Sequence, residues 1–216
     1  MNRPLSKIIP RCKQNIHPWQ IRLSHWINLL AMICMIMSGW GIYNAYPLFP
    51  FTFPQSTTLG GWLGGNIAWH LATMWLMAVN ALFYLLWGLF SGHFKRSFFP
   101  FSSKSVWRDT VRAFTFTLPH KLGEYNAVQR LMYVSVLLLG ALLVLSGLSI
   151  WKPVQLSGLV WLLGGFGSAR YVHFFAMSGV MLFVVIHVLM VLLVPKTFIA
   201  MITGGKKAHI QENTDE

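Results

Sequence analysis

The sequence predicts an all-α integral membrane protein, a four-helix bundle with both termini in the cytoplasm. Its composition is the first reason: 55% of the 216 residues are hydrophobic and 10% are charged, whereas about 25% of a typical soluble domain is charged. The second reason is the presence of apolar runs that are long enough to cross a bilayer, which takes about 20 residues. There are four of these runs, at residues 23–43, 67–90, 131–151 and 172–194.

The positive charges, which give a formal net charge of +12, predict the topology. Lys and Arg gather before the first run, between the second and third, and after the fourth, while the other two connections hold only Lys152 and Arg170. Basic segments remain on the cytoplasmic side of a membrane. We therefore expect a multi-pass protein of the bacterial cytoplasmic (inner) membrane whose basic segments meet lipid, with no nucleic-acid partner.

This topology divides the chain into a basic cytoplasmic N-terminal segment (1–17), the transmembrane bundle (18–195) and a cytoplasmic tail (196–216). No signal peptide is evident, because a long polar and basic segment precedes the first run and no small-residue cleavage site follows. The two cysteines, Cys12 and Cys34, exclude a disulfide framework and provide neither an iron–sulfur spacing nor a covalent haem motif.

The first half of the bundle follows from its prolines and aromatic residues. Pro18 suits the first turn of a helix, since its missing N–H would be unpaired there, and this helix should end near Tyr43. Residues 44–65 form an uncharged external loop rich in proline and aromatic residues. A simple loop at the membrane interface is the favoured interpretation, and contact with a partner is the alternative.

The second half has shorter signals. Residues 105–118 of the middle connection could form an amphipathic interfacial helix. In the third run, packing is sufficient to explain Gly140 and Gly147, which lie seven residues apart and so nearly on one face. Residues 156–167 are too short to span and should form a re-entrant segment or a small surface helix. Ser168 is a plausible N-cap of the last helix.

Four histidines lie inside the apolar runs: His25 in the first, His70 in the second, and His173 and His187 in the fourth. His173 and His187 are separated by roughly 21 Å along a helix and lie within roughly 40° of one face. With the predicted topology, His70 and His173 form an outer pair, and His25 and His187 an inner pair. We expect His17, His93, His120 and His209, outside the runs, to be solvated.

Two facing imidazoles can bind a haem iron from both sides, and with both axial positions filled the iron can only exchange electrons. Zinc would need about four ligands at one point, so the pairs favour two haem b groups. Arg22 and Arg170 each precede a histidine by three residues, on the same face and one turn closer to the membrane surface. They could bind haem propionates or simply reach the interface.

Several segments resemble the bacterial dihaem cytochrome b subunits of formate dehydrogenases, nickel–iron hydrogenases and thiosulfate reductases. The resemblance covers about residues 17–195, and residues 35–45 look closest to members that accompany sulfite-oxidase-type molybdopterin proteins. The segments that carry it are Arg22-Leu-Ser-His25-Trp26, Trp69-His70, Tyr125-Asn126-Ala127-Val128-Gln129-Arg130 and Arg170-Tyr171-Val172-His173 with His187.

The resemblance implies a membrane anchor that transfers electrons between the quinone pool and a periplasmic redox subunit, which is suspected to be of the molybdopterin type. It also implies a quinone near the inner haem, approached by Asn126 and His187, and Gln129 of the same segment is a further candidate contact. Val128 stands where the family motif has Gly, and its branched side chain could narrow that pocket. Asn126 and Gln129 could equally be capping or interface residues.

Two other classes of protein remain as alternatives: a histidine-based proton or ion relay, and a membrane anchor without a cofactor. A relay commonly pairs His with an acid inside the membrane, and none of the five acidic residues lies in an apolar run. As an electron-transfer subunit, the chain would not be catalytic on its own.

Overall fold

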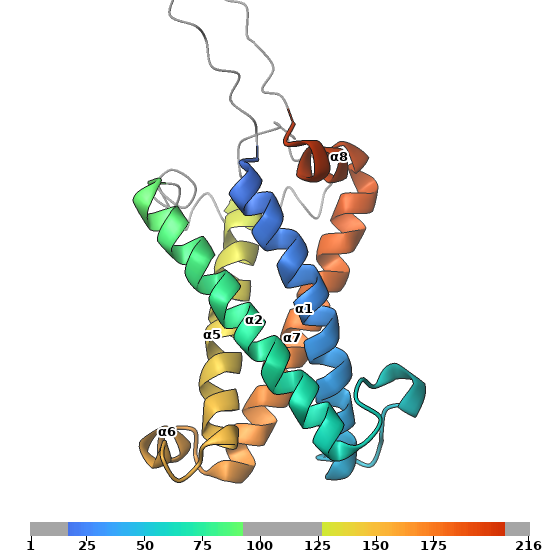
Figure 1. Cartoon of the computed structure of the whole chain (residues 1–216), viewed down its shortest axis with the longest axis vertical. Helices are drawn as coiled ribbons and strands as arrows, with labels where there is room; N and C mark the ends of the chain where they lie inside the picture. The colour runs from blue at the N-terminus through green and yellow to red at the C-terminus, as the bar shows by residue number, and fades with distance from the viewer. Residues whose placement is uncertain (1–16, 93–126, 206–216) are drawn as a thin grey trace, which may run out of the picture.

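The computed structural model describes residues 17–92 and 127–205, without the side chains of residues 127–131 and 133. It is all-helical in this part (Figure 1). In chain order the elements are α1 (Trp19–Ala45), the 3₁₀ helix η1 (Gln55–Thr57), α2 (Leu63–Phe90), α5 (Ala127–Trp151), α6 (Ser157–Leu162), α7 (Phe166–Leu193) and α8 (Pro195–Thr203).

The four helices α1, α2, α5 and α7 are long and apolar enough to cross a membrane, as predicted. Each covers one of the four predicted runs, except that Val194 follows the end of α7, and each helix begins four to six residues before its run. Many of their large apolar side chains are exposed, including Leu30, Trp75 and Leu182. Exposed apolar side chains on long apolar helices are what a lipid-facing surface requires. The all-α, four-span prediction is confirmed, and the cytoplasmic placement of the termini stays a prediction.

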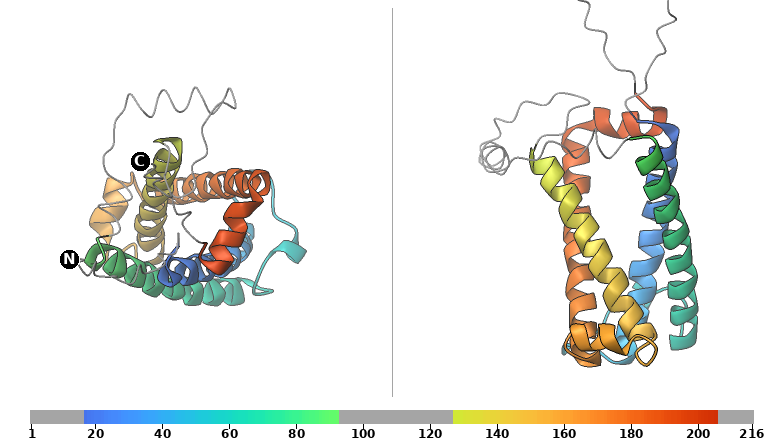
Figure 2. Two further views of the ribbon diagram at one scale, coloured as in Figure 1. Left: turned by 90° about the horizontal axis from the view of Figure 1, so that it is seen from above. Right: turned by 90° about the vertical axis from the view of Figure 1, so that its left-hand side faces the viewer.

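The four spans are arranged as two hairpins that face one another. Helices α1 and α2 pack together along their length, as do α5 and α7, whereas helices of different hairpins approach closely at few points in the described part of the chain. Figure 2 shows the pairs on opposite sides, with α8 crossing between them at one end. Because α6 lies at the other end (Figure 1), we call the two ends of the bundle the α6 end and the α8 end.

Polar and small side chains hold the first hairpin, α1 with α2, together. The Oγ of Ser24 donates to Oδ1 of Asn80 at 3.0 Å, and Nδ2 of Asn80 donates to the Ser24 carbonyl at 2.9 Å and to Asn28 Oδ1 at 2.8 Å. Nearer the α6 end, Asn66 covers Gly41 so closely that a Cβ there would lie 2.3 Å from its Nδ2. Interhelical hydrogen bonds and small residues are the usual means of helix association in lipid, where apolar contact alone gives little preference.

Helix α8 was not expected and covers the start of α1. The backbone N–H of His17 donates to the Gly204 carbonyl at 3.0 Å, and a guanidinium nitrogen of Arg22 donates to the Ile202 carbonyl. The rings of Trp26 and Phe198 meet edge to face, with centroids 6.1 Å apart. These contacts join the end of the last hairpin to the beginning of the first, so α8 closes one end of the bundle.

Two local predictions are corrected or decided by the structure. The prediction of Ser168 as an N-cap is wrong, because α7 begins at Phe166 and its N-cap is Gly165, with a φ of 101°. A positive φ is easily adopted only by glycine, so the chain turns at this residue and Ser168 falls inside the helix. Of the two alternatives for residues 156–167, the surface helix is observed as α6, with Trp161 and Leu162 exposed. The possible helix at 105–118 lies outside the described residues.

Candidate metal centre

At the α8 end, the structure brings His25 of α1 and His187 of α7 together across the two hairpins. Their ring centroids are 6.1 Å apart and the ring planes are inclined by 59°. Aromatic rings flank both: Trp26 meets His25 edge to face at 5.3 Å, and Phe183 stacks on His187 at 5.9 Å. The two histidines are 162 residues apart in the sequence, so the sequence could indicate this proximity only through the predicted topology.

This separation fits two imidazoles bound to opposite sides of one metal ion. A metal–imidazole nitrogen bond is about 2 Å long and the ring centre lies about 1 Å beyond the nitrogen, so two such rings have centroids about 6 Å apart. Within the described segments, no three His, Cys, Asp or Glu side chains gather into a metal site. The donor set is therefore a pair of imidazoles, which matches the two axial positions of a haem better than the four-ligand shell of zinc.

At the α6 end, His70 of α2 and His173 of α7 have closely similar surroundings. Nδ1 of His70 lies 3.0 Å from Ser38 Oγ on α1, and Nδ1 of His173 lies 3.0 Å from Ser146 Oγ on α5. The two imidazoles are close enough to interact electrostatically. Each hairpin thus contributes one histidine of this pair, on its second helix, and one serine on its first.

A glycine follows each of these serines and lies against the same imidazole. A Cβ on Gly39 would lie 3.4 Å from Cε1 of His70, and one on Gly147 would lie 3.2 Å from Cε1 of His173. Gly147 therefore packs against the imidazole itself, which is more specific than the helix packing expected from the sequence. A Ser-Gly dipeptide, with a histidine 32 or 27 residues after the serine, is the sequence signal that could have revealed these contacts.

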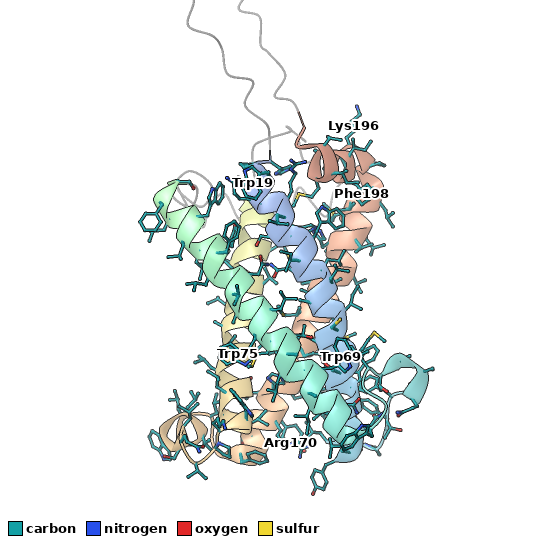
Figure 3. The ribbon with its side chains drawn as sticks, viewed as in Figure 1. Trp19, Trp69, Trp75, Arg170, Lys196 and Phe198 are labelled. Atoms are coloured by element: carbon teal, nitrogen blue, oxygen red, sulfur yellow. The ribbon has the colours of Figure 1, made fainter. Side chains whose placement is uncertain are left out.

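The two arginines lie at opposite ends of the bundle, and each is bonded to a backbone carbonyl. Arg170 is at the α6 end, whereas Trp19, Lys196 and Phe198 mark the α8 end (Figure 3). The Arg170 guanidinium donates to the backbone carbonyl of Tyr46 and lies 4.9 Å from the centre of the Tyr46 ring. Arg22 donates to the carbonyl of Ile202 in α8, while its Nε is buried without a hydrogen-bond partner among the described residues. Each guanidinium has five N–H donors, so donors remain available for an anion.

The remaining sequence-predicted residues are only partly described. Asn126 lies outside the described residues, and Gln129 lies in the first turns of α5 with its side chain outside the described part. Of the histidines expected to be solvated, His17 is half-buried at the α8 end. Burial and the neighbouring Arg22 guanidinium lower its pKa from the usual 6.5. His93, His120 and His209 lie outside the described part.

The interior of the bundle fits flat cofactors between the hairpins. Among the described residues the buried apolar side chains are small, namely Ala31, Ala169, Ala176, Val180 and Ala200, and the largest fully buried ones are serines. A soluble four-helix bundle fills the same position with large apolar side chains. Two histidine pairs, glycines beside the imidazoles and small interior residues together describe the interior of a membrane-embedded cytochrome b.

The chain belongs to the prokaryotic cytochrome b561 family, which it matches over residues 16–204. Membership implies haem b as the cofactor and a prokaryotic membrane as the location, in agreement with the four spans. The resemblance seen in the sequence is thereby confirmed at the level of the family. No solved structure matches the chain.

Three relatives show the range of this similarity. The chain is 49% identical, over 88% of its length and 96% of the relative's, to a putative protein-methionine-sulfoxide reductase subunit, YedZ1, of Azospira oryzae. It is 22% identical to a probable Ni/Fe-hydrogenase B-type cytochrome subunit of Cupriavidus necator, over 78% of this chain and 74% of the relative. A protein of the same description from Azotobacter chroococcum is 24% identical, over 78% of this chain and 75% of that one.

Proposed function

We propose that this protein is a dihaem cytochrome b that transfers electrons across the membrane between the quinone pool and a redox subunit on the periplasmic side. The observation that carries the proposal is the His25–His187 pair, which joins the two hairpins at 6.1 Å between ring centroids. His70 and His173 are the corresponding ligands at the α6 end. Haem b at both pairs would supply one-electron transfer over most of the membrane thickness.

The protein's own contribution is to limit the chemistry to electron transfer. Two histidines, one from each side, would hold the iron of each haem and would leave no position for O₂ or a substrate. The surrounding helices are apolar, which keeps water away from the interior of the bundle. Arg22 and Arg170, one turn closer to the surface than His25 and His173, are suited to hold propionates in addition to their carbonyl contacts.

The positive-inside pattern supports an orientation with the α8 end in the cytoplasm and the α6 end in the periplasm. A quinone would then exchange electrons at the α8 end, near His187, with Asn126 and Gln129 as its candidate contacts. The redox partner, a molybdopterin-type subunit, would dock at the α6 end. Because the relative from Azospira oryzae is named as a subunit of a protein-methionine-sulfoxide reductase, we propose outward electron flow from quinol to a reductase of that kind.

The proposed reaction balances in electrons and protons. Oxidation of a quinol to the quinone releases two electrons and two protons. Reduction of a methionine sulfoxide to methionine and water consumes the same number of each. The cytochrome transfers the electrons one at a time, and the protons are exchanged with water on each side of the membrane.

The haem content of single and double histidine variants tests the proposal. We expect about two b-type haems per wild-type chain in a pyridine haemochrome assay, and one after H70A, H173A, H25A or H187A. Because the two ligands of a pair share one iron, H70A/H173A should retain one haem, whereas H70A/H25A should retain none.

The matched control is H17A, which removes a histidine at the α8 end that lies outside the spans and should leave two haems. The proposal is wrong if H70A retains two haems, or if H70A/H173A retains none while H25A/H187A does the same. Reduction of both haems by a quinol in proteoliposomes, followed by oxidation on adding a methionine sulfoxide reductase, would establish the direction of electron flow.

A further inference from the structure

We infer that Ser38 and Ser146 are positioning residues that orient the two outer histidines and make Nε2 of each the nitrogen that faces the metal. The inference rests on the proposed function, since it concerns the ligands of the outer haem. It adds two residues to the site and assigns each one a hydrogen bond of defined direction.

The direction of these hydrogen bonds follows from the number of protons on each hydroxyl. Ser38 Oγ lies 2.6 Å from the carbonyl oxygen of Cys34, and Ser146 Oγ lies 2.6 Å from the carbonyl oxygen of Leu142. A carbonyl oxygen can only accept, and a serine hydroxyl has one proton to donate. Because that proton is used within the helix, each Oγ can only accept from the histidine 3.0 Å away.

The imidazole is therefore the donor in both pairs, through Nδ1–H. A neutral imidazole that carries its proton on Nδ1 has its lone pair on Nε2, and it is the lone pair that binds a metal. Metal-bound histidines usually donate their other N–H to a partner, which fixes the tautomer and the orientation of the ring. Ser38 and Ser146 are those partners here, and both are completely buried, with exposed fractions of 0%.

The glycine beside each serine completes the restraint. Gly39 and Gly147 let each imidazole approach the neighbouring helix closely, since Cε1 lies 3.4 Å and 3.2 Å from the position that a Cβ would take. The serine then fixes rotation of the ring about its long axis, since only one orientation places Nδ1 at the hydroxyl. The same Ser-Gly pair on α1 and on α5 thus provides two equivalent supports, one for each side of the outer haem.

This contact should also influence the redox potential. Donation of the Nδ1–H makes an imidazole more basic, and a more basic ligand stabilises the oxidised iron. Removing the acceptor should therefore raise the midpoint potential of the outer haem. No serine hydroxyl occupies the corresponding position in the described surroundings of the inner pair, which His25 and His187 form between Trp26 and Phe183. The inner haem should be unaffected.

The test is a redox titration of the purified full-length protein, followed by optical and low-temperature EPR spectra. We expect S38A and S146A each to raise the midpoint potential of one of the two haems and to change its EPR g-values, with a larger shift in the double variant. S38T and S146T keep a hydroxyl that can bond to the preceding turn, so they should restore the wild-type values. S149A is the matched control, because Ser149 is equally buried and its Oγ donates to the backbone carbonyl of Ser146 at 2.7 Å.

The outcomes separate this inference from the proposed function. If the wild type and all variants hold two haems with unchanged potentials, the serines do not position the ligands, and the dihaem cytochrome remains. Selective loss of one haem in S38A, with retention in S38T and S149A, would support the inference as a potential shift would. Equal losses in S38A and S149A would overturn it, and a wild type without haem would remove both proposals.

Discussion

Gly147 and Gly140 lie on the same face of α5 but differ in what surrounds them. A Cβ on Gly147 would lie 3.2 Å from the His173 ring, whereas a Cβ on Gly140 has no neighbour within 4 Å in the described part of the chain. Both glycines belong to α5 and lie seven residues apart. The sequence alone makes them equivalent, and the structure makes only Gly147 part of the outer site.

This difference predicts unequal effects of larger side chains. G147L should displace His173, lower the haem content from two to one per chain, and reduce stability by about 1–3 kcal/mol, as is usual for overpacking. G140L should retain both haems and the wild-type melting temperature within a few degrees. Haem content and thermal unfolding in detergent are the measurements. Equal behaviour of the two variants would contradict the assignment of Gly147 to the site.

At the scale of residues, the sequence identified the groups whose presence in a membrane is costly. An imidazole in an apolar helix is unusual, so His25, His70, His173 and His187 were recognisable without a structure. Serine is different, because it can satisfy its hydroxyl within its own helix. The second contact of Ser38, with His70, depends on the helix opposite and could not be predicted from local sequence. Asn80 was missed for the same reason.

Helix α8 is the element that connects the end of the second hairpin to the start of the first. It has nine residues, and a helix this short is marginal in isolation. Contacts with His17 and with the start of α1 therefore help to stabilise it, through the carbonyls of Gly204 and Ile202 and the ring of Phe198. His17 lies in this junction, where burial and then the Arg22 charge lower its pKa from 6.5.

The lowered pKa of His17 predicts that acid weakens the junction. Below pH 6.5 the unfolded chain takes up a proton at His17 that the folded chain resists. The stability of the folded protein therefore decreases as the pH is lowered from 6.5 to the pKa that His17 has in the folded chain. The melting temperature of the wild type should drop more from about pH 7.5 to about 5.5 than that of H17Q. At pH values above this range the two proteins should respond alike, since His17 is neutral in both states. The expectation is wrong if H17Q is as acid-sensitive as the wild type.

At the scale of elements, length determined what could be predicted. The spans were recognisable because some 20 apolar residues in succession seldom occur outside membrane-spanning helices. Helix α8 is short, follows α7 directly after Val194 and begins with Pro195. The residues after the last span could therefore be interpreted as part of the tail. The start of α7 was misplaced because Ser168 has the chemistry of an N-cap, whereas the turn itself is made by Gly165.

For the whole molecule, the positive-inside rule gives a definite orientation, which cysteine labelling can test. Val154, beside α6, is 82% exposed, and Lys196, in α8, is also exposed. In a background where Cys12 and Cys34 are replaced by serine and alanine, V154C should react with a membrane-impermeant maleimide in intact spheroplasts. K196C should react only after permeabilisation. The reverse result would invert the topology and place the redox partner in the cytoplasm.

The two-hairpin arrangement also has a consequence for biosynthesis. Each hairpin has its own hydrogen bonds and close packing, whereas the described part of the chain has few direct contacts between hairpins. A ribosome could therefore deliver the hairpins into the bilayer one after the other, and each would persist as a folded half. The last joining step would depend on the supply of the prosthetic group, because the histidines that would hold it lie on α1 or α2 and on α7. A cell short of iron or porphyrin would then accumulate halves that membrane proteases can open, and abundance of the mature protein would follow porphyrin synthesis.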